Sequence, residues 1–161
     1  MTLIVFYDNT LHDVVAPSRS LRLQVGRGEN PEKLWMSGGG KGIFWTPGQA
    51  RKFLTSLTRM ANRLERGRVT DKVFFAHDIY DDEGAVLGVD LGVLCLHPYI
   101  AINDTRVSVA PEDICFLHAC CQQAHFLCGG IGVAGLVPRT PGTGRPYDGR
   151  VHDEFDFQRF G

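Results

Sequence analysis

The sequence predicts an α+β protein of two tandem ββββα repeats, antiparallel sheets each followed by an amphipathic helix, with an extended C-terminal tail. Three observations support this prediction: the chain resembles itself at an offset of 64 residues, each copy places a proline between a short strand and a helix, and turn signals separate the apolar segments upstream. The predicted boundaries are 1–68 for the first repeat, 69–128 for the second, and 129–161 for the Gly- and Pro-rich tail.

The most similar parts of the two copies are residues 42–64 and 106–128. Each begins as a strand, passes through Thr46-Pro47 or Ala110-Pro111, and continues as a helix, since proline suits the first helical position. Apolar or weakly polar residues then recur at helical spacing: Ala50, Phe53, Leu54, Leu57, Met60, Ala61 and Leu64 in the first copy, and Ile114, Leu117, His118, Cys121, Ala124, His125 and Cys128 in the second. Both sets predict one buried helical stripe.

Strand signals precede each helix. In the first half they cover residues 2–8, 21–25 and 33–37, and in the second they cover 72–78, 85–96 and 97–100. A sheet with one apolar face must be covered by its helix or by the other repeat. The alternative is that strand, proline and helix follow one another twice by chance.

Composition excludes several classes of protein. With 43% hydrophobic and 22% charged residues, the chain is too apolar for a disordered protein, and it contains no apolar run of membrane-spanning length. The first residues lack the basic start of a signal peptide. Five cysteines, an odd number, make a poor disulfide framework, so we expect reduced thiols and a cytoplasmic location.

Charge is distributed unevenly along the chain. Residues 1–68 carry eleven Lys and Arg against five Asp and Glu, whereas residues 69–128 carry two against nine. The basic half could face a phosphate backbone. The alternative is that the two halves attract each other or a second copy of the chain, which would make a homo-oligomer.

Strand alternation predicts a candidate binding face on the first repeat. If Leu21, Leu23, Val25, Leu34 and Met36 meet the helix, a set of basic, amide and aromatic side chains faces outward. This set comprises Arg22, Gln24, Lys33, Trp35 and Phe44, with Lys41 in the glycine-rich turn and Tyr99 at the position equivalent to Trp35. Exposed aromatic rings among cations suit base stacking and phosphate attraction, although packing alone also favours aromatic residues in strands.

Tandem ββββα units are similar to the Whirly, PUR-repeat and positive-cofactor class of single-strand nucleic-acid binders. The segment GGGKGIFWTPGQARKFLTSL resembles the last strand and helix start of that group, in which a glycine-and-lysine turn leads into a strand and a proline helix entry. The resemblance implies that the outward sheet face carries single-stranded DNA or RNA.

Two other regions suggest different functions. The helix that carries His118, Cys121, His125 and Cys128 suggests a metal site or a small Cys/His enzyme. However, ten residues of helix separate the first of these side chains from the last, which is too far for all four to bind one ion. We therefore expect no catalytic activity, metal or cofactor. Phe155, Phe157 and Phe160 in the tail suggest a docking peptide. A protein partner that binds this tail or the acidic second repeat would make the chain a protein-interaction module, such as a phage or mobile-element accessory protein that inhibits or assembles with a partner complex.

Overall fold

The computed structural model describes residues 3–29, 33–124, 136–140 and 145–146. The first repeat consists of β1 (Leu3–His12), β2 (Ser20–Gly28), β3 (Leu34–Ser37), β4 (Ile43–Phe44) and α1 (Pro47–Glu65). The second consists of β5 (Lys72–Tyr80), β6 (Val86–Leu94), β7 (His97–Ile102), β8 (Thr105–Ser108) and α2 (Pro111–Gln123). Two further strands follow, β9 (Leu136–Thr140) and β10 (Arg145–Pro146).

The strands form two antiparallel sheets. Sheet 1 has the order β1-β2-β3-β4, and sheet 2 has the order β10-β9-β5-β6-β7-β8. The α+β prediction and the repeated sheet-then-helix arrangement are therefore confirmed. Two segments of the predicted tail extend sheet 2, because β9 pairs with β5 and β10 pairs with β9.

The repeat extends to the backbone irregularities of the sheets. Each first strand contains a bulge, between Val5 and Tyr7 in β1 and between Val73 and Phe75 in β5. A glycine lies opposite each bulge, and a Cβ atom on Gly26 or Gly92 would approach a carbonyl oxygen of the bulged strand within 2.7 Å. Both bulges therefore need a partner residue without a side chain.

The helices begin alike in the two repeats. Pro47 and Pro111 occupy the first turns, and the third residue of each helix accepts a hydrogen bond from the N–H group before the proline. Only the first helix completes a reciprocal capping box, since Thr46 Oγ1 also accepts from Gln49 N, and alanine in the second repeat has no side-chain acceptor.

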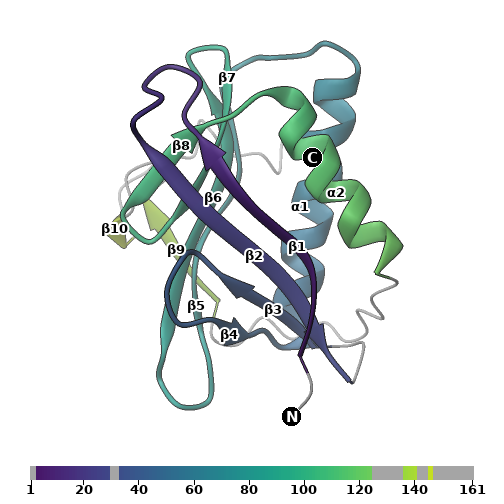
Figure 1. Cartoon of the computed structure of the whole chain (residues 1–161), viewed down its shortest axis with the longest axis vertical. Helices are drawn as coiled ribbons and strands as arrows, with labels where there is room; N and C mark the ends of the chain where they lie inside the picture. The colour runs from purple at the N-terminus through teal and green to yellow at the C-terminus, as the bar shows by residue number, and fades with distance from the viewer. Residues whose placement is uncertain (1–2, 30–32, 125–135, 141–144, 147–161) are drawn as a thin grey trace.

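One hydrophobic core joins the two repeats. The helices lie side by side and cover the inner faces of the sheets (Figure 1). Helix α1 contacts β5 of the second repeat, and α2 contacts β1 of the first. The core includes buried residues from both sheets and both helices, so the repeats fold against each other rather than as separate cores.

An aromatic cluster links the repeats at the centre of this core. Trp45 and Phe53 of the first repeat lie 5.1 Å apart between ring centroids, and Phe53 meets Phe75 of the second repeat edge to face at 5.4 Å. The next inward-facing residue of β5, His77, lies 4.6 Å from Phe75. Such ring pairs stabilise the interface between the repeats, in addition to the stability that comes from burying their apolar surface.

His118 and Thr58 connect the two helices. The Thr58 hydroxyl donates its proton to Leu54 O at 2.9 Å and lies 3.0 Å from His118 Nε2. Because a hydroxyl has one proton, His118 must donate at the second contact, which requires the Nε2-protonated tautomer. Burial lowers the pKa of His118, which favours this neutral form.

We expect acid to destabilise the protein through His77. Burial, followed by the charge of Lys52, lowers the pKa of His77 from 6.5 to about 4. A folded-state pKa below the unfolded value means that stability is complete above about pH 6.5 and is lost as the pH falls toward 4. The free energy of unfolding should fall by roughly 1–2 kcal/mol between about pH 7 and pH 5. Urea denaturation at both pH values measures this loss, and a His77→Leu variant that keeps the full pH dependence would contradict the assignment.

Candidate nucleic-acid interface

The outer face of sheet 1 carries two adjacent aromatic side chains. Trp35 on β3 and Phe44 on β4 are direct cross-strand partners, and both are half-buried. Leu34 and Met36, which alternate with Trp35, are buried in the core, as the alternation predicts. The Trp35 indole occupies the space above Gly42, because a Cβ atom there would collide with its ring. The two rings therefore share one outer surface that neither described helix covers.

The turn between β3 and β4 presents Lys41 beside these rings. Ser37 is fully buried, and its hydroxyl donates a hydrogen bond to Gly40 O at 2.8 Å. Gly39 adopts the left-handed region, with φ +94, which a side chain would disfavour. Gly38 packs directly against Ile102 of the second repeat. The glycine-rich segment is thus a fixed turn that holds Lys41 at the edge of the sheet.

A cleft of about 570 Å³ opens beside Phe44, whereas Trp35 is not among its lining residues. One wall comes from the first repeat and includes Lys33, Lys41 and Phe44. The other wall comes from the β5–β6 hairpin of the second repeat and includes Tyr80, Asp82 and others of that turn. Three of the residues that the sequence predicts for the site therefore meet in one hollow, and both lysines are exposed.

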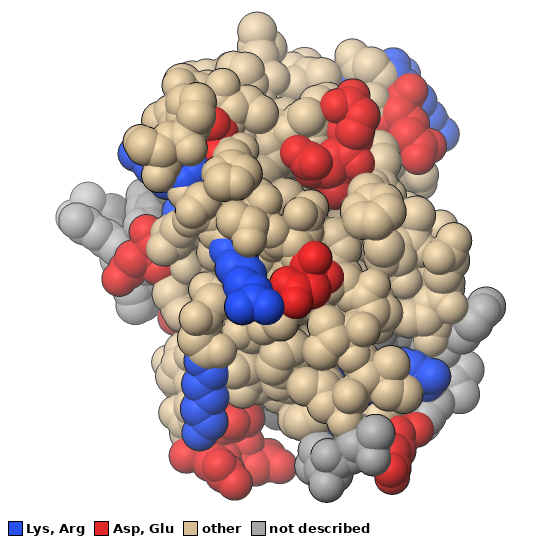
Figure 2. Space-filling view, in the orientation of Figure 1, with Lys and Arg blue, Asp and Glu red and all other residues tan. Residues whose placement is uncertain are grey.

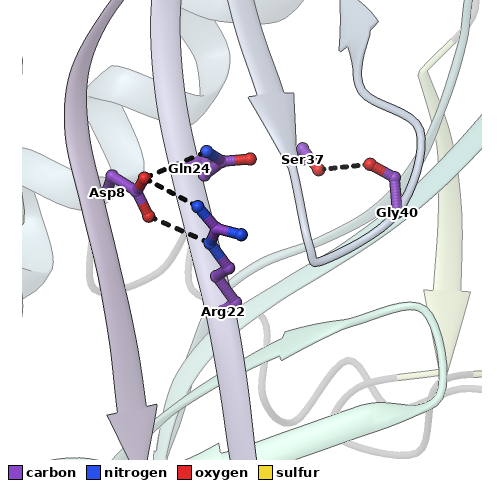
Figure 3. A network of polar contacts seen from close by, with 5 residues as sticks. All are labelled: Asp8, Arg22, Gln24, Ser37 and Gly40. Carbon is purple, nitrogen blue, oxygen red and sulfur yellow. Dashed lines mark hydrogen bonds and ion pairs between the residues drawn. The ribbon is translucent and has the colours of Figure 1, made fainter.

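Arg22 and Gln24 face outward as predicted, but both bind Asp8 (Figure 3). Arg22 Nε donates to Asp8 Oδ1 at 3.2 Å and Arg22 Nη2 to Asp8 Oδ2 at 3.0 Å, while Gln24 Nε2 donates to Oδ2 at 3.1 Å. The hydrogen bonds from Arg22 and Gln24 lower the pKa of Asp8 and keep it ionised. This part of the face is therefore close to neutral, and the surrounding surface in Figure 2 is mostly uncharged.

If this face binds single-stranded oligonucleotides, replacing Asp8 by asparagine should strengthen that binding. The change removes a negative charge from the face and releases the Arg22 guanidinium for phosphate, so we expect roughly two- to fivefold tighter binding and a steeper salt dependence. Fluorescence anisotropy with a labelled oligonucleotide measures both. A matched control is Asp104→Asn, an exposed carboxylate in the turn between β7 and β8. Equal gains in the two variants would contradict a specific role for the Asp8 pair.

The second repeat does not offer an equivalent face. Tyr99 lies at the Trp35-equivalent position, but its exposed fraction is 3%, so the expectation of an outward, accessible ring is wrong. The ring lies against Gly92, with the Arg106 guanidinium 5.7 Å from its centroid. Burial, followed by the charge of Asp90, raises the pKa of Tyr99. Both faces of sheet 2 are buried here, since Asp90 and Ala101 are also inaccessible.

The remaining sequence predictions concern the Cys/His helix and the tail. His118 and Cys121 are buried in the core stripe of α2, while His125 and Cys128 lie outside the described residues. Within the described part of the chain, no three His, Cys, Asp or Glu side chains are grouped to hold a metal ion. Phe155, Phe157 and Phe160 also lie outside the described residues. No described helix is long and apolar enough to cross a membrane.

Sequence reasoning missed two groups that shape this site. Asp8 was not recognised as the partner of Arg22, because the bulge in β1 decides which way Asp8 faces. The acidic turn at residues 81–83 has no sequence signal that links it to the basic repeat, yet it lines the same cleft as Lys33 and Lys41. No protein-family model, curated protein or solved structure matches this chain.

Proposed function

We propose that the protein binds single-stranded nucleic acid on the outer face of sheet 1. The observation that carries this proposal is the half-buried Trp35–Phe44 pair on a sheet face that no described helix covers, with the exposed Lys33 and Lys41 beside it. Bases stack on accessible aromatic rings, and lysines attract the phosphates between them. The four residues supply both interactions within one small area.

The arrangement favours single strands over duplexes. In a duplex the flat faces of the bases are stacked on each other, so rings on a sheet surface can reach them only after unpairing. Two lysines near the rings match a short stretch of backbone, whereas the Asp8–Arg22 pair leaves the neighbouring surface nearly neutral. Binding should therefore depend on stacking as much as on charge.

Fluorescence anisotropy with a labelled single-stranded 15-mer and its duplex tests this function. Two phosphate contacts on a single strand give a log–log salt slope of about −1.4, so affinity should fall about sevenfold between roughly 50 and 200 mM salt. The duplex should bind more weakly at both concentrations. Absent binding, salt-insensitive binding or a preference for the duplex would each contradict the proposal.

A second candidate function is a protein-interaction module, and the edge strand β1 favours it. Three consecutive large apolar residues of β1 are exposed, Leu3 at 38%, Ile4 at 43% and Val5 at 41%. Among the described strands β1 forms the end of sheet 1, and apolar edge strands pair readily with another chain. Sedimentation velocity of the wild type and an Ile4→Lys variant tests this candidate for self-association. A wild type that stays monomeric at all concentrations would contradict pairing between copies.

A further inference from the structure

We propose that the cleft between the repeats is a subsite for one nucleotide and prefers bases that carry an exocyclic amino group. This inference rests on the proposed function and adds a specificity to it. The phosphate would lie at Lys33 and Lys41, and the amino group would donate to the carboxylates of Asp82 and Glu83 on the opposite wall. Cytosine carries an amino group at the ring position where thymine carries a carbonyl. Comparing the binding of these two bases therefore tests the preference.

The two walls of the cleft differ in charge: the wall from the first repeat carries Lys33, Lys41 and one carboxylate, Glu29, whereas the hairpin wall carries Asp81, Asp82 and Glu83 and no Lys or Arg. Lys33 and Lys41 come from the basic repeat, whereas Asp82 and Glu83 come from the turn of the acidic repeat, and all four side chains are exposed. Two ion pairs of the described residues, Arg22–Asp8 and Arg19–Asp13, lie outside the cleft. The cleft thus offers a cationic side and an acceptor side to a ligand that carries both an anion and hydrogen-bond donors.

The walls are held in place by contacts that do not use these four side chains. Gln49 is fully buried at the start of α1, and its Nε2 donates to Tyr80 O at 3.4 Å, which ties the first repeat to the hairpin of the second. Asp81 Oδ1 accepts hydrogen bonds from Glu83 N at 2.9 Å and Ala85 N at 2.8 Å. Asp81 therefore shapes the turn through its own carboxylate, whereas these turn contacts do not use the side chains of Asp82 and Glu83.

The size and lining of the cleft suit a nucleotide. Its volume of about 570 Å³ falls within the usual range for small-ligand pockets. Phe44 lines one wall and Tyr80, with 39% of its surface exposed, lines the other, so a base can contact a ring while its edge faces the acidic turn. Carboxylates accept hydrogen bonds from the cytosine amino group but repel the thymine carbonyl at that position.

Competition between labelled dC15 and dT15, measured by anisotropy at neutral pH, tests the inference. The wild type should bind dC15 about tenfold more tightly than dT15, since one good contact to a base edge discriminates by about that factor. The Asp82→Ala/Glu83→Ala double variant should lose this preference. The matched control is Asp104→Ala/Glu112→Ala, which removes two exposed carboxylates outside the cleft and should keep the tenfold ratio.

Each outcome bears on one of the two proposals. Loss of the preference in the cleft variant alone supports the subsite. Equal binding of dC15 and dT15 by the wild type, or an equal change of both affinities in the cleft and control variants, overturns the subsite while the single-strand binding function stands. Failure of both oligonucleotides to bind would instead overturn the function itself.

Discussion

Replacing Trp35 by alanine should lower affinity for single-stranded oligonucleotides by roughly 5- to 150-fold. One stacked base contributes roughly 1–3 kcal/mol, and the variant removes the larger ring of the Trp35–Phe44 pair. Trp35→Phe keeps a ring at the same position and should recover most of the affinity. Anisotropy titrations of the three proteins at one salt concentration measure the difference.

Two controls separate stacking from a general loss of structure. Tyr99→Phe changes the equivalent ring of the second repeat, which is buried, and should leave oligonucleotide affinity unchanged. Circular dichroism should show that Trp35→Ala remains folded, because its side chain lies on the outer face rather than in the core. A folded Trp35→Ala protein with wild-type affinity would remove Trp35 from the interface.

Replacing Gly92 by alanine should strongly destabilise the protein. The new Cβ atom would lie 2.7 Å from Lys72 O in the bulged strand β5 and 2.5 Å from the Tyr99 hydroxyl oxygen. A backbone carbonyl held by a bulge cannot move aside cheaply, so we expect a loss on the order of 2–4 kcal/mol in the free energy of unfolding.

The matched control is Gly40→Ala in the turn between β3 and β4. A Cβ atom on Gly40 would meet nothing within 4 Å, so stability should change little. Thermal and urea denaturation of both variants measure the contrast. Equal stability of Gly92→Ala and Gly40→Ala would contradict the close approach of Gly92 to the backbone of β5.

The architecture could be predicted from the sequence because the signals for helix starts and for strands are local. Pro47 and Pro111 mark the helix starts, and the buried Leu34 and Met36 follow the alternation of a strand. His118 and Cys121 were also placed correctly in the core stripe of α2, because the equivalent positions in the first helix are apolar.

The candidate site was less predictable because it depends on distant parts of the chain. Alternation placed Tyr99 on the face opposite the core, but it could not show that this face of sheet 2 is buried. The bulge between Val5 and Tyr7 shifts the strand by one residue, which turns Asp8 outward, opposite Gln24 and next to Arg22. A one-residue shift reverses the facing of every following side chain, and no local pattern announced it.

The uneven charge of the two halves has a spatial counterpart at the cleft. The charge distribution in the sequence allows the basic half either to face a phosphate backbone or to attract the acidic half. The cleft combines these possibilities, because Lys33 and Lys41 face solvent on one wall while Asp82 and Glu83 stand on the other. The acidic turn therefore modifies the basic surface without covering it.

Quenching of tryptophan fluorescence by an oligonucleotide tests the central claim most directly. The chain has two tryptophans, of which Trp45 is fully buried in the aromatic cluster and Trp35 is only half-buried on the sheet face. If bases stack on Trp35, a saturating single-stranded oligonucleotide should quench the wild-type emission, and Trp35→Phe, which retains Trp45 alone, should show no quenching. Binding by anisotropy without quenching in the wild type, or equal quenching in Trp35→Phe, would contradict the account.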